Sequence, residues 1–171
     1  MAIDIVIIAA LELERDAVVA AMRGVHDVQR QGRTFHVGQI GEYSVAVLCI
    51  HGMGNVKSAT AATTAIHEFE PTAILVAGIA GGTNKPTSER FDRGSHLLGD
   101  VLVAEQILDY ESGKQSPEEI ERRYEVYRSS KTLLDSAKDI KSDWTLNVKS
   151  PRPDHTTGRV VPTVHFGVFA S

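Results

Sequence analysis

Runs of β-branched and apolar residues alternate along the chain with segments in which apolar residues recur at helical spacing. The runs are typical of strands buried in an α/β sheet and cover residues 3–9, 34–40, 43–50, 73–78, 99–107 and 163–170. Only Gly41 and Glu42 separate the second run from the third, which predicts a tight antiparallel hairpin. The sequence therefore predicts a mixed sheet.

Three segments predict helices. In residues 11–24, Leu11, Val18 and Met22 share one side, and Gly24 is the candidate C-cap. The second helix follows a glycine turn, ends before Pro71, and has one apolar side made of Val56, Ala59, Ala62, Ile66 and Phe69. The third covers residues 129–140, with Ser129 or Ser130 as N-cap and an inward face of Leu133, Leu134, Ala137 and Ile140. The expected architecture is a three-layer αβα fold with a central mixed sheet.

The segments between these elements are polar. We expect a surface loop at residues 83–98 and a long loop at 142–163, where three prolines interrupt a polar stretch. Residues 117–128 are charged and predict either a helix or a mobile flap. A chain of 171 residues predicts a single domain, and its last segment has the pattern of a buried strand. We therefore expect residues 1–171 to be one C-terminally incomplete domain.

The composition excludes several classes of protein. The formal net charge is −4 and no run of basic residues is present, which disfavours nucleic acid and anionic membranes as partners. The longest apolar stretches are far shorter than the roughly 20 residues that span a bilayer. A single cysteine, Cys49, excludes an internal disulfide and agrees with a reducing cytoplasm. The sequence predicts a cytoplasmic protein.

Two glycine turns lie at the ends of apolar strands. They contain Gly52, Met53 and Gly54 in one case and Gly78, Ile79, Ala80, Gly81 and Gly82 in the other. In open α/β sheets, ligands bind beyond the carboxyl ends of the strands, and glycines let backbone N–H groups approach a ligand closely. Each turn alone can be a simple tight turn, but together they favour a ligand site.

The glycine turns do not match a nucleotide-cofactor motif. The third glycine of G-x-G-x-x-G is replaced by Lys57, and no G-x-x-x-x-G-K-[ST] loop occurs. The seven histidines form no H-E-x-x-H motif, which disfavours a zinc hydrolase. His51 and His165 adjoin strand ends, where they can line a pocket, although a satisfied buried or half-buried histidine is the commoner outcome. Cys49 has the pattern of a core residue. We expect no cofactor and no metal.

Glu14 is the candidate catalytic carboxylate. At about 100° per residue it lies some 60° from the apolar stripe of the first helix, so it borders the core in the first helical turn. That position is above the strand ends, where a carboxylate can orient or deprotonate a water molecule. A lone first-turn glutamate is more commonly a surface acid that complements the helix dipole.

Several segments resemble the nucleoside phosphorylase/nucleosidase family in the family's order. They are IVIIAALELERDAV, HGMGNVKSATAATTAI with PTAILVAGIAGG, LGDVLVAEQILDYE and VHFGVFAS. The resemblance implies substrate-binding contacts at Ala10, Met53, Gly54, Gly78, Ile79, Ala80 and Gly81. It implies that Glu14 positions the attacking water, as in hydrolytic adenosine-type nucleosidases. Phosphorolytic members have a phosphate-binding arginine where this chain has Val76, so hydrolysis fits better.

The resemblance also implies a homodimer, in which residues 107–110 reach across to a neighbouring subunit. The family's E-M-E ribose-binding segment and catalytic Asp lie beyond Ser171, so we expect residues 1–171 alone to be nearly inactive. We expect a purine nucleosidase of the methylthioadenosine/adenosylhomocysteine type, acting on a small purine nucleoside.

Two alternatives remain open. The first is a phosphorolytic enzyme or a nucleotide N-glycosidase, in which basic residues of the polar loops would meet phosphates; these residues are Arg90, Arg93, Arg122 and Arg123. Solvated surface charge is the simpler interpretation of those residues. The second is a non-catalytic nucleoside-sensing module of a larger protein.

Overall fold

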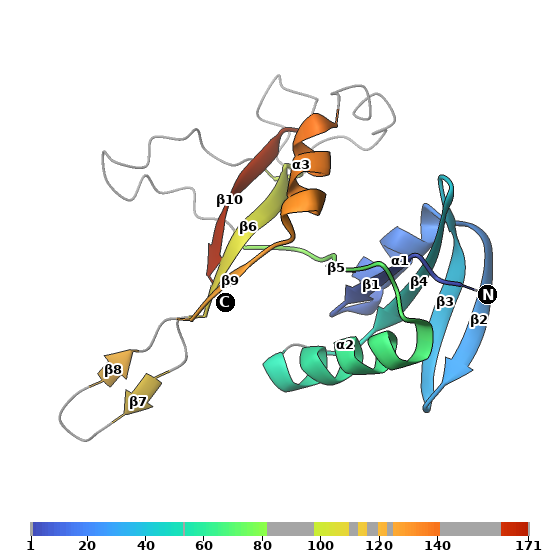
Figure 1. The fold of residues 1–171 in the computed structure, drawn as a ribbon, viewed down its shortest axis with the longest axis horizontal. Coiled ribbons are helices and arrows are strands. Elements are labelled where there is room, and N and C mark those ends of the chain that lie inside the picture. Colours follow the sequence, from blue (N-terminus) through green and yellow to red (C-terminus); the bar gives the residue numbers. More distant parts are fainter. Residues whose placement is uncertain are drawn as a thin grey trace. The chain divides into compact units, whose positions relative to one another are not determined.

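A computed structural model describes residues 2–52, 54–81, 98–109, 113–115, 120–122, 125–140 and 162–170 (Figure 1). The chain divides into two compact units, Met1–Ala80 and Gly81–Ser171, which we call unit 1 and unit 2. The loops that we predict at residues 83–98 and 142–163 lie almost entirely outside the described residues. Within the described part, none of the helices is long and apolar enough to cross a membrane.

Unit 1 contains one five-stranded mixed sheet. Its elements are β1 (Ile5–Ala9), α1 (Glu12–Ala20), β2 (Arg23–Arg30), β3 (Arg33–Ile40), β4 (Tyr43–Cys49), α2 (Asn55–Phe69) and β5 (Ala73–Val76). The strand order is β2-β3-β4-β1-β5. β1 pairs in parallel with β4 and β5, whereas β3 pairs antiparallel with β2 on one side and with β4 on the other. The predicted hairpin is confirmed, and Gly41 in its turn has a φ of +60°.

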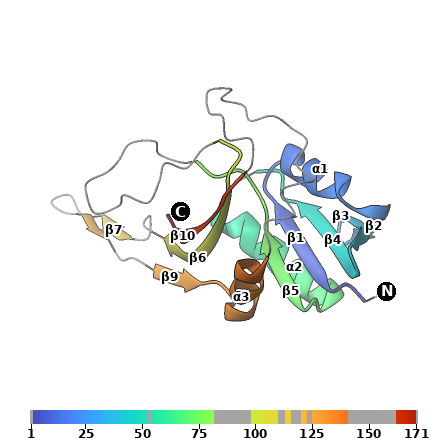
Figure 2. The same ribbon diagram turned by 90° about the horizontal axis from the view of Figure 1, so that it is seen from above.

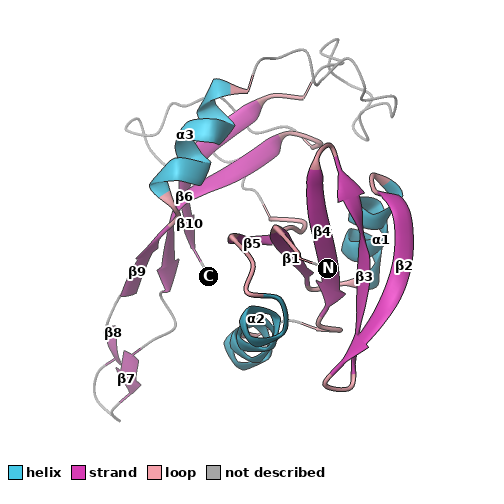
Figure 3. Cartoon of the chain, turned by 45° about the vertical axis from the view of Figure 1, so that its right-hand side comes forward, coloured by secondary structure: helices cyan, strands magenta, loops and turns pink. Residues whose placement is uncertain are grey.

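The two helices of unit 1 cover opposite faces of this sheet (Figures 2 and 3). Alternate residues of β1 face opposite ways, as the pleat of a strand requires. One core cluster lies against α2 and contains Ile3, Val6, Ile8, Phe35, Val37, Ala46, Leu48, Ile50, Ala61 and Ala65. The other lies on the α1 side and contains Ile7, Met22, Val45 and Val47. The predicted three-layer architecture with a central mixed sheet is confirmed in unit 1.

The predicted extent of the first helix is wrong. α1 ends at Ala20, with Ala21 as its C-cap, and the next strand, β2, begins at Arg23. Met22 is buried against the sheet after the helix has ended. Gly24 is not a helix cap: it lies within β2 with a φ of +64°, near an irregularity in the pairing with β3.

The predicted buried face of α2 is also wrong in part. Val56, Ala59 and Ile66 are exposed, and the buried residues are Ala61, Thr64 and Ala65. Small side chains bring the helix backbone close to the sheet, so the packed face is not the most hydrophobic one. The Thr64 hydroxyl is satisfied within the helix, since it donates to Thr60 O at 2.9 Å.

Unit 2 contains a three-stranded sheet, a two-stranded ribbon and one helix. Its elements are β6 (Val101–Asp109), β7 (Gly113–Gln115), β8 (Ile120–Arg122), β9 (Glu125–Arg128), α3 (Lys131–Asp139) and β10 (Val164–Ala170). The sheet order is β10-β6-β9, with β10 parallel and β9 antiparallel to β6. The strands β8 and β9 show that the described part of residues 117–128 is not helical, which corrects the first of the two predicted alternatives.

The helix α3 begins after Ser130, which confirms one of its two predicted N-caps. Lys138 attaches it to the sheet, because its Nζ donates to Glu105 Oε1 at 2.6 Å and lies 5.4 Å from the centre of the Phe166 ring. Its predicted inward face is only partly correct, because Leu133 and Ile140 are exposed while Leu134 and Ala137 are half-buried.

The ring of Phe35 anchors α2 on the sheet. It is fully buried and meets Phe69 edge to face, with ring centres 4.9 Å apart. The substitution Phe35→Leu removes this contact between the rings and leaves part of the volume of the Phe35 ring unfilled. We expect a loss of about 1–2 kcal/mol in the free energy of unfolding. Urea denaturation measures it, with Tyr43→Leu as the control, because Tyr43 is half exposed at the start of β4. A loss no larger than that of the control would contradict this packing.

Candidate functional site

The carboxyl ends of three parallel strands meet at one edge of the unit 1 sheet. Main-chain hydrogen bonds continue past the strands and tie their following turns together. Ile50 N donates to Ala9 O at 3.0 Å, and Gly52 N donates to Ala10 O at 2.9 Å. On the other side of β1, Ala77 N donates to Ile8 O at 3.0 Å. The turn after β1 is therefore fixed between the two glycine turns.

The Glu14 side chain lies at this edge and accepts three backbone hydrogen bonds. Its Oε2 accepts from Ala10 N at 3.0 Å and from Leu11 N at 2.9 Å, in the turn that enters α1. Its Oε1 accepts from Ile79 N at 2.8 Å, in the turn after β5. Glu14 is the one buried residue of α1 and is only 9% exposed. It therefore links the turn after β1 to the second glycine turn.

The hydrogen bonds also decide the charge of this carboxylate. Burial raises the pKa of Glu14, because it disfavours the charged form, and this is the largest influence on it. The N–H groups of Ile79, Leu11 and Ala10 together outweigh burial and leave the pKa below its ordinary value. Glu14 is therefore ionised at neutral pH. A carboxylate has about four acceptor sites, so three donors leave about one for a further ligand or water.

The lowered pKa predicts an acid-sensitive contribution of Glu14 to stability. A carboxyl group whose pKa is lower when folded than when unfolded stabilises the protein above the unfolded value of about 4.5. The contribution is lost as the pH falls from there through the folded pKa. We expect the stability difference between wild type and Glu14→Gln to be constant near neutral pH and to shrink in that acid range. Urea denaturation at a series of pH values measures it, and a difference that grew on acidification would contradict the assignment.

Gly78 provides the space that the Glu14 carboxylate occupies. A Cβ atom at Gly78 would lie 2.8 Å from Glu14 Oε1 and 3.2 Å from Cδ. Such distances are well inside van der Waals contact, so a larger residue cannot be accommodated without moving the carboxylate. The glycine therefore permits the hydrogen bond from the next residue, Ile79, to Glu14.

An open, mostly apolar pocket of about 310 Å³ adjoins Glu14. It lies between α1 and the turn after β5 and is lined by Leu13, Glu14, Ala17, Val18, Ala77, Gly78 and Ile79. Glu14 is the only ionisable residue among them. A carboxylate held by three donors beside an apolar hollow can orient a water molecule and can stabilise a neighbouring positive charge.

The structure brings together four of the residues predicted for the site, namely Ala10, Glu14, Gly78 and Ile79. Ala80 and Gly81 follow Ile79 directly and are exposed. Gly54 is the N-cap of α2, with a φ of +122° that favours glycine. Met53 lies outside the described residues. The role of each residue in binding or catalysis stays a prediction.

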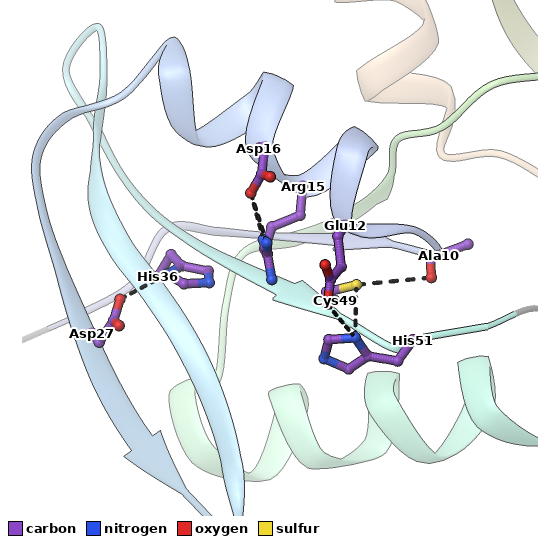
Figure 4. Close-up of polar contacts among 8 residues, drawn as sticks. All are labelled: Ala10, Glu12, Arg15, Asp16, Asp27, His36, Cys49 and His51. Carbon is purple, nitrogen blue, oxygen red and sulfur yellow. Dashed lines mark hydrogen bonds and ion pairs between the residues drawn. The ribbon is translucent and has the colours of Figure 1, made fainter.

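A second polar cluster, which sequence reasoning did not assemble, lies next to Ala10 (Figure 4). His51 follows β4, and its Nδ1 lies 3.3 Å from Glu12 Oε1 and 3.8 Å from Cys49 Sγ. The Cys49 thiol also approaches Ala10 O at 3.8 Å. The feature of the sequence that could have pointed to this cluster is a histidine, His51, directly before a glycine turn. Among the described residues, no group of three histidine, cysteine or acidic side chains is arranged to hold a metal ion.

Comparisons with known proteins identify relatives of this chain. The profile of the Phosphorylase superfamily matches residues 4–171. The 5'-methylthioadenosine/S-adenosylhomocysteine nucleosidase of Oceanobacillus iheyensis is 26% identical over 146 residues, which are 82% of this chain and 59% of that protein. The chain thus spans little more than half the length of that relative.

Solved structures of nucleosidases have the same fold. The enzyme from Colwellia psychrerythraea in complex with adenine matches with a TM-score of 0.70 and 20% identity, covering 100% of this chain and 62% of that one. The enzyme from Neisseria meningitidis in complex with methylthio-immucillin-A matches with a TM-score of 0.68 and 20% identity, covering 98% and 64%. At this identity the likeness concerns the fold alone.

Proposed function

Because the chain belongs to the phosphorylase superfamily, we propose that the full-length protein is a purine nucleosidase. In this proposal it breaks the N-glycosidic bond of an adenosine-type nucleoside or thionucleoside by attack of water. The observation that carries the proposal is the buried Glu14 carboxylate, ionised and held by three backbone donors at the carboxyl edge of the sheet. The names of the similar nucleosidases support the substrate class.

The charge and geometry of Glu14 suit an oxocarbenium-like transition state, in which positive charge develops on the sugar as the purine leaves. An ionised carboxylate stabilises this charge, and its remaining acceptor site can hold the attacking water. A carboxylate of lowered pKa is a weak base for free water. Water that has begun to bond to the sugar cation is far more acidic, so Glu14 can accept its proton late in the reaction.

Val76 favours water over phosphate as the nucleophile. It is the last residue of β5, two residues before Gly78, and is 81% exposed. An isopropyl side chain there offers no charge and no hydrogen bond to a phosphate. The resemblance places an arginine at this position in phosphorolytic enzymes, so its replacement supports hydrolysis.

We further propose that the protein acts in the cytoplasm as a homodimer. Of residues 107–110, expected to reach a neighbouring subunit, the first three lie in β6 and Tyr110 lies outside the described residues. Sedimentation of the full-length protein that gave only monomer at micromolar concentration would contradict the dimer.

Release of free adenine tests the reaction itself. We expect the full-length protein to convert 5′-methylthioadenosine or S-adenosylhomocysteine to adenine and a free sugar at the same rate with and without inorganic phosphate. Chromatography measures adenine, and a reducing-sugar assay separates hydrolysis from phosphorolysis. Strict dependence on phosphate would support the phosphorolytic alternative. Binding without adenine release under either condition would support a nucleoside-sensing module.

A further inference from the structure

His51 has a strained backbone at the same edge of the sheet. Its φ is +50°, a left-handed conformation that is unfavourable for a residue with a side chain. Two other residues with side chains have a positive φ in the described part of the chain, and each has an ordinary reason: Gln31 lies in the β2–β3 turn and Glu70 caps α2. His51 instead lies between the last ladder bond of β4, made by Ile50, and the bond from Gly52 to Ala10. The neighbouring bonds hold it in this conformation.

Glu12 fixes the tautomer of the His51 ring. Its Oε1 atom lies 3.3 Å from Nδ1, and because a carboxylate only accepts hydrogen bonds, this position favours the tautomer with the proton on Nδ1. The contact with Cys49 agrees with this arrangement, because the thiol can donate to Ala10 O while its sulfur faces the Nδ1–H group. The two carboxyl-end turns are thereby bridged through side chains as well as through the main chain.

The second ring nitrogen of His51, Nε2, has no protein partner within the described residues. The side chain is 64% exposed and directly precedes the first glycine turn. With the proton on Nδ1, the neutral ring presents a lone pair at Nε2. It can therefore accept a hydrogen bond from a ligand hydroxyl or amino group. It cannot bind the ring nitrogens of adenine to which no hydrogen is attached, because those are acceptors too.

We propose that His51 is a further ligand-binding residue, whose Nε2 accepts a hydrogen bond from a hydroxyl group of the nucleoside's sugar. Glu12 is its positioning residue and holds the ring by Nδ1. The proposal rests on the proposed nucleosidase function for the identity of the ligand. A hydroxyl is favoured over the amino group of adenine because a Cβ atom at Gly54, in the adjoining turn, would meet nothing within 4 Å, which leaves room for a sugar ring against the backbone there. At Gly52 the Lys57 Nζ atom would lie 2.8 Å from such a Cβ atom.

The test measures binding of tubercidin, the 7-deaza analogue of adenosine, to the full-length protein by calorimetry. Its carbon at position 7 cannot take up a proton as the base leaves, so binding is separated from turnover. In His51→Asn the amide can still face Glu12, and asparagine tolerates the left-handed conformation, so mainly Nε2 is removed. We expect Kd to rise about tenfold. His67→Asn is the matched control, because His67 is exposed in the last turn of α2.

The 2′-, 3′- and 5′-deoxy derivatives of tubercidin identify the hydroxyl. One of these derivatives should bind the wild-type protein about tenfold more weakly than tubercidin does, and the His51→Asn substitution should not lower its affinity further. Glu12→Leu should weaken tubercidin binding about threefold, and Glu12→Gln, whose amide oxygen still accepts from Nδ1, should restore most of it. Circular dichroism and thermal unfolding verify the fold of each variant.

The inference is overturned if His51→Asn binds tubercidin as the wild type does. It is also overturned if the His51→Asn substitution weakens the binding of every deoxy derivative as much as it weakens the binding of tubercidin. The same conclusion follows if 7-deazainosine, which lacks the amino group, is the one analogue whose affinity does not depend on His51. Binding of tubercidin that depends on His51, without adenine release from natural nucleosides, would overturn the proposed function and support the inference. Absence of any tubercidin binding to the wild type would overturn both.

Discussion

The substitution Glu14→Gln should lower kcat by at least about 10²-fold in the full-length protein while leaving nucleoside affinity little changed. The amide keeps the shape of the side chain but removes its negative charge and basicity. One end also becomes a donor, so it cannot satisfy both the Ala10 and Leu11 N–H groups and the Ile79 N–H group. We therefore also expect a loss of about 1–3 kcal/mol in the free energy of unfolding.

Steady-state kinetics below the unfolding transition separate the two effects of Glu14→Gln. The control is Glu42→Gln, because Glu42 lies exposed in the β3–β4 turn. If Glu14 only caps α1, stability should fall and kcat should not. A folded Glu14→Gln protein that kept more than half of the wild-type kcat would remove the main support for the hydrolytic mechanism. The phosphorolytic alternative would then be favoured.

The substitution Gly78→Ala should disturb the same carboxylate without touching its chemistry. The new methyl group would lie 2.8 Å from Glu14 Oε1, so the carboxylate must move away from Ile79 N. We expect a loss of stability of about 1–3 kcal/mol and a fall in kcat of at least about tenfold, since a small misplacement of a catalytic group is costly. Kinetics and urea denaturation of the same preparation measure both.

Gly81→Ala is the stability control for Gly78→Ala. A Cβ atom at Gly81 would meet nothing within 4 Å, so its free energy of unfolding should stay within about 0.5 kcal/mol of wild type. Equal stability losses in the two alanine variants would show that the Gly78 effect does not come from contact with Glu14. A Gly78→Ala protein with wild-type kcat would show that the position of this carboxylate does not limit turnover.

The strands of the core could be predicted because their burial leaves a continuous apolar pattern. β1 and β4 are covered on both faces, so nearly every residue in them is hydrophobic. β2 could not be recognised in this way. It is an exposed edge strand with residues such as His26, Asp27 and Gln29, and its pairing with β3 rather than its own pattern makes it a strand.

The face of α2 illustrates a different limit. Hydrophobicity pointed to Val56 and Ile66, but contact with the sheet selects residues small enough for close approach, which are Ala61 and Ala65. In the candidate site, helical geometry correctly predicted that Glu14 borders the core. It could not predict the three backbone donors, because the Ile79 N–H group is 65 residues away in the chain. The contact between Glu12 and His51 is likewise visible only in three dimensions.

The two edges of the unit 1 sheet differ in how they are protected. β2, at one edge, carries charged and polar side chains, which discourage pairing with another chain. β5, at the other edge, is the short apolar run Ala73–Val76, with Leu75 and Val76 exposed. Because an apolar edge strand pairs readily with another chain, a proteolytic fragment limited to unit 1 would be prone to intermolecular β-pairing along β5. Self-association and precipitation, rather than unfolding, would then limit how long such a fragment stayed in solution.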